Sequence, residues 1–114
     1  MRRFRFSDLG KQPGRHVLAG LLEGEWLNHG GLSFHPAGFR THGEEAVHTH
    51  ETQEAFCILQ GRGILELDGE KIPVQAGDVI IIEPGENHHL ISSEDEPIIN
   101  LWLHAGEEPH PNQR

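Results

Sequence analysis

The segment HTHETQEAFCILQG, residues 48–61, joins metal-competent side chains to a strand-like apolar run. In an extended chain, residues two apart point to the same side, so His48, His50 and Glu54 are expected on one face. Two imidazoles and a carboxylate converging there suit a divalent metal. The alternative is a polar loop with histidines by chance, because the chain contains 10 of them. A further histidine elsewhere in the chain that completes the ligand set would favour the metal site over the polar loop.

Further strands are expected on both sides of this segment. Apolar runs bounded by turn residues predict strands at residues 16–23, 31–35, 54–60, 63–67, 70–74, 79–82, 88–92 and 98–104. Residues 40–47 are polar and are predicted as a loop. No segment has a sustained helical period, and turn signals recur about every eight to twelve residues. This pattern predicts an all-β sandwich or barrel, and a jelly-roll-like barrel would offer a mouth for a ligand.

The dipeptide Asp68-Gly69 predicts the tightest of the turns. It lies between two strand-like runs and has the preferred chemistry of a two-residue hairpin loop. The implied register puts Leu65 opposite Ile72 and Gly63 opposite Val74, which keeps apolar positions together. The run 79–82 is apolar on both faces, so a second sheet or a subunit is expected to cover it on both sides.

Length and charge limit the function. The 114 residues fit one domain, here divided into an N-terminal arm (1–15), a barrel domain (16–104) and a polar tail (105–114). The net charge of −9 argues against nucleic acid or an anionic membrane as a partner. Small molecules or another protein remain. No apolar run is long enough for a signal peptide or a membrane span, which predicts a soluble, cytoplasmic protein.

The single cysteine, Cys57, excludes an internal disulfide and a Cys-based zinc site. A strand over residues 54–60 would turn Glu54, Phe56 and Ile58 to one face and Cys57 to the other, away from the metal side. We therefore interpret Cys57 as a small buried hydrophobic residue, compatible with a reducing compartment.

Two motifs at ordered spacing resemble those of the cupin superfamily. The first has the form His-x-His, three or four residues, Glu, six residues, Gly, and it is matched by His48, His50, Glu54 and Gly61. The second has the form Gly, five residues, Pro-x-Gly-x-x-His, three residues, Asn, and it is matched at Gly77, Gly85 and His88. Two positions of the second motif depart from the pattern: Glu83 replaces its proline and Ser92 its asparagine. These departures affect turn and strand-end positions rather than the expected ligands.

The resemblance implies a small single-domain cupin. Its fold would be an all-β, cupin-type jelly-roll barrel, also called a double-stranded β-helix, with one divalent ion held by His48, His50, Glu54 and His88. Three imidazoles and a carboxylate favour Fe, Mn, Ni, Co, Cu or Zn over Ca or Mg. An octahedral ion would keep about two positions open for a substrate or for dioxygen.

Subunits of such proteins usually pair, so a homodimer is expected. The two-sided apolar run 79–82 and the phenylalanines of the N-terminal arm point the same way.

Residues around the expected ion are less clearly indicated. His42 and His104 are candidate catalytic acid or base groups, although His42 also reads as a solvated loop residue. Expected substrate-pocket residues are Phe34, Arg40, Phe56, Ile58 and Trp102, with plain core as the alternative for Phe34, Phe56 and Ile58. His89 should point away from His88, to the outside.

The last strand leaves two orientations open. Asn100, Trp102 and His104 share one of its faces, and Ile99, Leu101 and Leu103 share the other. If the polar face looks inward, Trp102 lines the pocket and His104 is near the ion. If the aliphatic face looks inward, the polar residues lie outside at an interface.

Two classes of function fit these features. The first is a metal-dependent enzyme acting on a small polar organic molecule, of the dioxygenase, decarboxylase, isomerase or lyase type. The second is a non-catalytic, metal-dependent module that binds a sugar or an organic acid.

Overall fold

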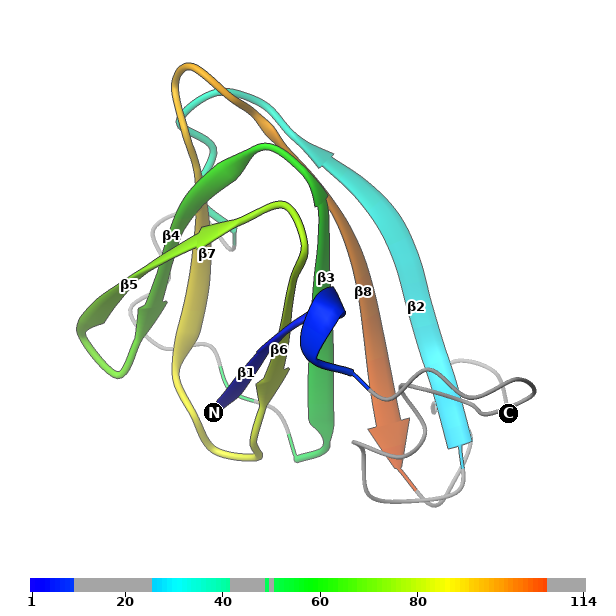
Figure 1. Cartoon of the computed structure of the whole chain (residues 1–114). Coiled ribbons are helices and arrows are strands. Elements are labelled where there is room, and N and C mark those ends of the chain that lie inside the picture. The colour runs from blue at the N-terminus through cyan, green and yellow to red at the C-terminus, as the bar shows by residue number, and fades with distance from the viewer. Residues whose placement is uncertain (10–25, 42–48, 50, 107–114) are drawn as a thin grey trace.

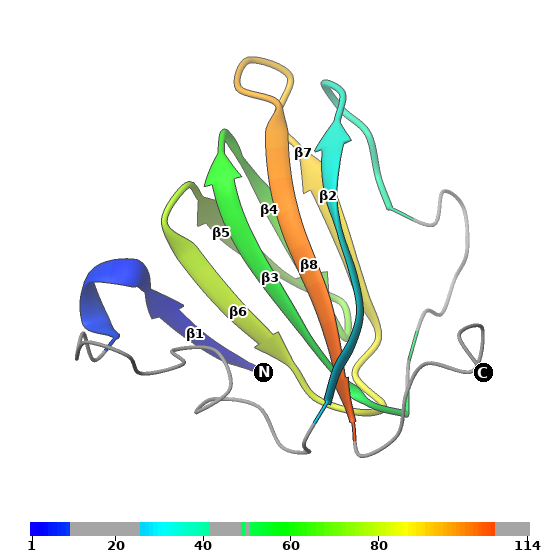
Figure 2. The same cartoon turned by 90° about the vertical axis from the view of Figure 1, so that its right-hand side faces the viewer.

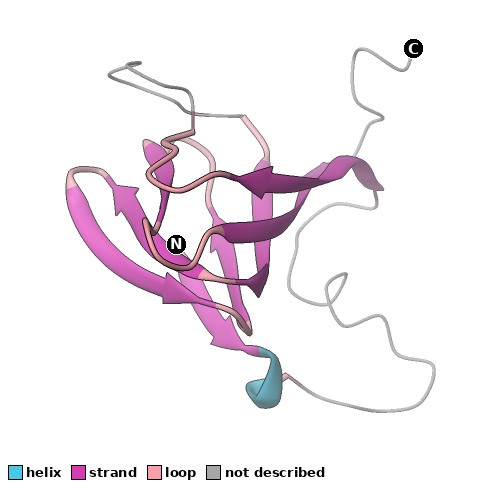
Figure 3. Ribbon diagram, turned by 90° about the horizontal axis from the view of Figure 1, so that it is seen from above, coloured by secondary structure: helices cyan, strands magenta, loops and turns pink. Residues whose placement is uncertain are grey.

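The computed structural model describes residues 1–9, 26–41, 49 and 51–106 (Figure 1). These residues form two antiparallel sheets that face each other (Figure 2), and apart from one short helix they consist of strands and the loops that join them (Figure 3). The five-stranded sheet has the order β1-β6-β3-β8-β2, and the three-stranded sheet has the order β5-β4-β7. The elements are β1 (Arg2–Arg5), the 3-10 helix η1 (Phe6–Asp8), β2 (Trp26–His35), β3 (Gln53–Gln60), β4 (Arg62–Leu67), β5 (Glu70–Gln75), β6 (Asp78–Ile82), β7 (His88–Ser92) and β8 (Ile98–Gly106). The predicted all-β jelly-roll architecture is confirmed.

The predicted strands from residue 54 onward are found within one or two residues of their expected bounds. The strand expected at 31–35 is longer, because β2 begins at Trp26 and runs through Gly30 and Gly31. Gly31 is needed there for close packing, since a Cβ atom on it would lie 3.0 Å from Cζ2 of Trp102. The strand expected at 16–23 and most of the loop expected at 40–47 lie outside the described residues.

The hairpin between β4 and β5 has the predicted register. Leu65 pairs with Ile72 and Gly63 with Val74. At the turn, Asp68 has φ 49° and Gly69 has φ 85°, as a two-residue loop of this kind requires.

The two faces of the five-stranded sheet carry separate apolar clusters. The inner cluster fills the space between the sheets and contains Phe56, Ile58, Leu65, Val74, Ile80, Ile82, Leu90 and Ile98. The outer cluster contains Ala55, Cys57, Val79, Ile81 and Ala105, with Phe4 and Leu9 packed against it. Strand β6 is thus covered on both faces by this chain's own residues, so its apolar pattern does not require a partner subunit. Cys57 faces outward as predicted, and burial raises the pKa of its thiol.

Strand β1 is an edge strand of the five-stranded sheet, and its arginine side chains reach the other sheet. It pairs with β6 in the five-stranded sheet, so the first residues of the expected arm belong to the body of the protein. Arg3 Nη1 donates to the carbonyl oxygen of Pro73 (2.8 Å), and Arg5 Nη1 donates to that of Ala76 (3.0 Å) and to Asp78 Oδ1 (2.7 Å). These bonds satisfy carbonyl groups on and just after the edge strand β5.

None of the helical turns in the described part of the chain is long and apolar enough to cross a membrane.

Candidate metal centre

Three polar side chains meet on the inner surface between the sheets. Glu54 comes from β3, His88 from β7 and His104 from β8. Oε1 of Glu54 lies 3.0 Å from Nε2 of His88, and Oε2 lies 3.0 Å from Nε2 of His104. Glu54 is 6% exposed and His88 only 1%. A buried carboxylate therefore lies between two imidazoles.

Strand pairing explains how the three residues come together. Glu54 and His104 are direct cross-strand neighbours in the five-stranded sheet, so their side chains leave the same face. His88 belongs to the opposite sheet and reaches Glu54 across the interior. The site therefore exists only where the two sheets face each other.

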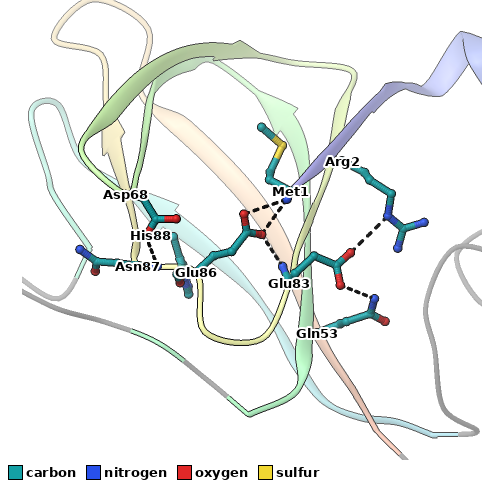
Figure 4. A network of polar contacts seen from close by, with 8 residues as sticks. All are labelled: Met1, Arg2, Gln53, Asp68, Glu83, Glu86, Asn87 and His88. Atoms are coloured by element: carbon teal, nitrogen blue, oxygen red, sulfur yellow. Dashed lines mark hydrogen bonds and ion pairs between the residues drawn. The ribbon is translucent and has the colours of Figure 1, made fainter.

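The turn that precedes His88 is held by a network of polar contacts (Figure 4). The main-chain N–H of Glu83 donates to Glu86 Oε1 (2.7 Å), and the amino group of Met1 lies 2.8 Å from the same carboxylate. The Glu83 carboxylate accepts hydrogen bonds from Arg2 Nε (3.2 Å) and Gln53 Nε2 (2.8 Å). These contacts join the turn to β1 and to the start of β3, one residue before Glu54.

The orientation of the His88 ring follows from this turn. Its Nδ1 lies 2.9 Å from the main-chain oxygen of Glu86 and donates to it. In the neutral ring this leaves the lone pair on Nε2, which points to Glu54. A histidine whose second nitrogen donates to a main-chain carbonyl is the arrangement found at metal ligands. This hydrogen bond fits a role for His88 as one ligand of an ion.

The carboxylate and the imidazole shift each other's pKa. Burial disfavours the charged form of Glu54, but hydrogen bonds from His104 and His88, together with their charge, outweigh burial and lower its pKa to about 2. Burial also disfavours charged His88, but its hydrogen bonds to Glu54 and Glu86 prevail and raise its pKa. Without a metal, the pair is therefore stabilised as carboxylate and imidazolium.

The rest of the expected ligand set cannot be placed. His48 and His50 lie outside the described residues, as does the candidate acid or base His42. Among residues that the structure does describe, no group of three or more His, Cys, Asp or Glu side chains is spaced to hold an ion. Glu54 instead contacts both His88 and His104 directly.

The polar face of β8 looks inward, which decides between the two orientations left open by its sequence. Asn100 is 1% exposed, and Trp102 packs against the inner cluster. Trp102 Nε1 donates to Ser33 Oγ (2.8 Å), and the Trp102 ring meets the His104 ring edge-to-face at a centroid distance of 5.8 Å. Ser33 was not expected at this site. The only hint in the sequence is that Ser33 is two residues from Gly31, so both point to the same face of β2.

The remaining expected pocket residues divide between inside and outside. Phe56 and Ile58 belong to the inner cluster, as either interpretation allowed. The prediction that Phe34 lines the pocket is wrong, because its side chain lies on the outer face and is 64% exposed. The inward positions of β2 are taken by Gly31, Ser33 and His35, so alternation turns Phe34 outward.

The arginine expected at the pocket is bound elsewhere. Arg40 pairs with Ile91 as an isolated bridge, and its Nη2 donates to Glu66 Oε1 (2.7 Å) on the outer side of β4. His89 also faces outward, as predicted, and is covered there, with Nδ1 3.1 Å from the main-chain oxygen of Thr41.

Ser92, where the second motif has asparagine, joins β7 to its neighbours. Its hydroxyl donates to the His35 carbonyl oxygen (2.9 Å) and accepts from the Ile98 main-chain N–H (2.9 Å). The replacement therefore keeps a polar link at the end of β7.

A surface groove of about 840 Å³ is a separate feature from this site. It runs beside β1 and the outer side of β4 and β5, and Arg3, Arg62 and Asp78 are among its lining residues. Glu54, His88 and His104 do not line it. The polar cluster inside the protein is the better candidate for chemistry, because it combines buried groups with shifted pKa values.

The fold and the site define a β jelly roll with a buried polar cluster beside its apolar core, and comparison with known proteins gives the family. A model of the cupin domain matches residues 38–104, which is more than half of the chain. The protein belongs to the cupin family. A crystal structure of a cupin protein from Bacteroides fragilis superposes with a TM-score of 0.61 at 33% identity, covering 68% of this chain and 64% of that one.

Two relatives with described roles differ in what they do. An oxalate-binding protein of Thermotoga maritima is 29% identical over 87 residues, covering 75% of this chain and 72% of that protein. An L-ectoine synthase of Wolinella succinogenes is 34% identical over 88 residues, covering 72% of this chain and 62% of the synthase. The chain also spans 42% of an uncharacterized protein of Methanocaldococcus jannaschii, with 41% identity over 56 residues. It thus matches less than two thirds of the length of two of these relatives.

Proposed function

We propose that this protein is a metal-dependent cupin enzyme that acts on a small polar organic molecule, by dioxygenase, decarboxylase, isomerase or lyase chemistry. The observation that carries the proposal is the buried Glu54 carboxylate between His88 and His104. A structural role alone gives no reason to bury a carboxylate with two imidazoles, because desolvating such charges costs several kcal/mol, on the order of what their attraction returns.

One divalent transition metal, from Fe, Mn, Ni, Co, Cu and Zn, would be held by His48, His50, Glu54 and His88. Support comes from the hydrogen bond that orients the His88 ring and from the nitrogen-rich donor set. When bound, the ion would supply Lewis acidity or, as iron, the capacity to activate dioxygen.

His104 would act as the acid or base of the reaction. Its Nε2 faces the interior beside Glu54, and its side chain is 15% exposed, so it can exchange a proton with a bound molecule. The edge of Trp102 holds the ring in place, and Ser33 holds Trp102. The apolar wall formed by Phe56, Ile58 and their neighbours would keep water from the reacting groups.

The substrate would be a small molecule with a carboxylate or adjacent oxygen groups that can replace water on the ion. Two of the relatives, an oxalate-binding protein and an L-ectoine synthase, are named for a small molecule that they bind or make. The proposed class is therefore small organic acids and related oxygen-rich compounds.

The test is turnover by protein reconstituted separately with Fe, Mn, Ni and Zn, in air, against oxalate, hydroxy acids, diketones and sugars. We expect product with at least one metal. His104→Ala should lower kcat by about 10²–10⁴-fold. His104→Gln is the matched control, because its amide can still bond to Glu54 but cannot take a proton, so it should bind the metal like the wild type and still have the lowered kcat.

The second candidate is a non-catalytic, metal-dependent binding module. It is favoured by the oxalate-binding relative, whose similarity extends over 75% of this chain. Metal-dependent binding of one of these compounds, with no product from any metal form, would select this candidate and contradict the enzyme proposal.

A further inference from the structure

The surface groove beside β1 concentrates positive charge on an otherwise acidic protein. Three of the chain's nine Lys and Arg residues line it, namely Arg3, Arg5 and Arg62, but only two of its 18 Asp and Glu residues do, Asp8 and Asp78. The chain as a whole has a net charge of −9. The groove is therefore a place where an acidic protein can still attract an anion.

Two of the arginines reach the groove from the edge of one sheet to the edge of the other. Strands β1 and β5 are edge strands of the two sheets (Figure 2). Arg3 and Arg5 are two residues apart on β1, so their side chains leave the same face. Their guanidinium groups donate to the main-chain oxygens of Pro73 (2.8 Å) and Ala76 (3.0 Å). These carbonyl groups hold the two side chains in place without neutralising their charge.

The negative groups of the groove are already engaged. Asp78 is 4% exposed, and its two oxygens accept from Arg5 Nη1 (2.7 Å) and from the main-chain N–H of Gln75 (2.8 Å). Asp8 Oδ2 accepts from the main-chain N–H of Arg5 (3.1 Å). Arg3 forms no ion pair with the residues that the structure describes, and its hydrogen bond there goes to a neutral carbonyl. Its charge is therefore open to an anion from outside.

The floor of the groove is apolar. On the outer side of the three-stranded sheet, Ile64 pairs with Pro73 on one neighbouring strand and with Ile91 on the other, and all three line the groove. Directly paired residues share a face, so they form a continuous apolar row. Arg62 lies two residues before Ile64, on the same side of the strand. Its ion pair with Glu96 (3.0 Å) is exposed on both partners, at 56% and 60%, and is therefore weak.

The free edge of β5 does not suit a peptide strand. Pro73 has no N–H, and the carbonyl oxygens of Pro73 and Ala76 are taken by Arg3 and Arg5. A strand that extended the sheet would need these main-chain groups for its ladder of hydrogen bonds. The free N–H groups of a guanidinium instead suit a carboxylate or a phosphate, which they can bind in pairs. The groove thus favours a small anion over an added strand.

We propose that this groove is a second ligand site, which binds a small organic anion with its carboxylate or phosphate group on Arg3 and its apolar part on the row formed by Ile64, Pro73 and Ile91. Its volume of about 840 Å³ is in the usual range of small-molecule sites, roughly 300–1,000 Å³. None of the described residues of the metal centre lines the groove. The proposal is therefore independent of the metal centre and of the proposed enzyme activity.

The test is an NMR titration of the isotope-labelled full chain, without added metal. The main-chain amides of Ile64 and Ile91 report on the groove, and those of Glu54 and His88 report on the metal centre. The probes are phenylacetate, phenyl phosphate, the neutral analogue phenylacetamide, and acetate, which lacks the apolar part. At least one of the two aromatic anions should shift the groove amides, with a Kd at least about 10-fold lower than those of phenylacetamide and acetate. The one that binds more tightly identifies the preferred anionic group.

Arg3→Gln removes the open positive charge and should raise the Kd of the preferred anion at least about 10-fold. Lys71→Gln is the matched control, because Lys71 is exposed on the same strand as Pro73 but does not line the groove. The same loss of charge there should change the Kd less than about twofold, since salt screens a distant charge. The amide spectra also show whether each variant is folded.

A titration that leaves the amides of Ile64 and Ile91 unshifted would overturn the proposal. Shifts confined to Glu54 and His88 would overturn it as well, because they would place the anion at the metal centre. In the wild type, equal affinities for phenylacetamide and the aromatic anions would show that the arginines do not select an anion, whether or not the Arg3 variant folds. Equal Kd values for the wild type and a folded Arg3→Gln would overturn the assignment to Arg3.

Discussion

At the scale of single residues, Glu54 is the side chain whose charge matters most. It is nearly buried, and its two carboxylate oxygens face two different imidazoles. Its pKa of about 2 means that the carboxylate stays ionised in the folded protein well below the pH at which an exposed glutamate takes up a proton. The cluster is therefore held together by charge as well as by hydrogen bonds.

Because of these charges, the free energy of unfolding of the metal-free protein should depend on pH. The lowered pKa of Glu54 stabilises the folded state above about pH 4.3, and this contribution is lost as the pH falls toward 2. The raised pKa of His88 stabilises it below about pH 6.5, and this contribution is lost as the pH rises through the folded-state value. Both contributions are present together between these limits.

Glu54→Gln should therefore lower the free energy of unfolding most at about pH 5.5, on the order of 1–3 kcal/mol, and less at about pH 3 and pH 8.5. Urea denaturation of metal-stripped wild type and variant at the three pH values measures the difference. A difference that does not change with pH would contradict the ionised pair.

At the scale of elements, turns with positive φ set where the strands begin. Gly61, which precedes β4, and Gly85, in the turn before His88, have the same φ of 83°. Their surroundings differ. A Cβ atom on Gly61 would lie 2.1 Å from the carbonyl oxygen of Pro97, whereas nothing lies within 4 Å of one on Gly85. Substituting the two glycines by alanine therefore separates two effects on the free energy of unfolding: that of the left-handed backbone conformation and that of a steric clash.

Gly85→Ala should destabilise the protein by about 1–2 kcal/mol, the cost of the left-handed conformation alone. Gly61→Ala should cost about 3 kcal/mol or more, because the main chain at Pro97 has to move as well. Chemical denaturation of both variants measures the two values. Equal losses would mean that the close approach at Gly61 is relieved cheaply.

At the scale of the whole molecule, the candidate site depends on how the two sheets meet. Glu54 and His104 belong to one sheet and His88 to the other. An ion held across this gap would bind the folded state and not the unfolded chain, so it would stabilise the whole protein.

A metal that binds the site, added at a free concentration of about 100 times its dissociation constant, should raise the free energy of unfolding of the wild type by about 2.7 kcal/mol. This corresponds to a rise in Tm of roughly 10 °C. His88→Ala should lose this rise and the bound metal. His89→Ala is the matched control, because the adjacent, equally buried ring faces outward. It should lower the starting Tm but keep the metal-dependent rise. Thermal melts and elemental analysis test both, and an undiminished rise in His88→Ala would contradict the assignment.

The sequence by itself determined the strands from residue 54 onward, the hairpin register and the resemblance to the family, but it missed β1 and the first half of β2. Leu65 pairs with Ile72 because turn chemistry and alternation are local properties, and local properties can be read along the chain. The spacing of two family motifs also predicted that His88 and Glu54 hold one ion. The structure brings the two side chains into contact, and the ion itself stays a prediction.

Only the tertiary structure decided which face of β2 and which face of β8 looks inward. The alternation in β2 and β8 is equally compatible with either orientation, so the sequence could place Phe34 inside and leave His104 undecided. The orientation follows from burial against the second sheet. Trp102 packs over Gly31, and His104 lies beside Glu54 in the interior. Phe34 then points outward, where it is exposed. Local patterns define faces, and packing between distant segments chooses among them.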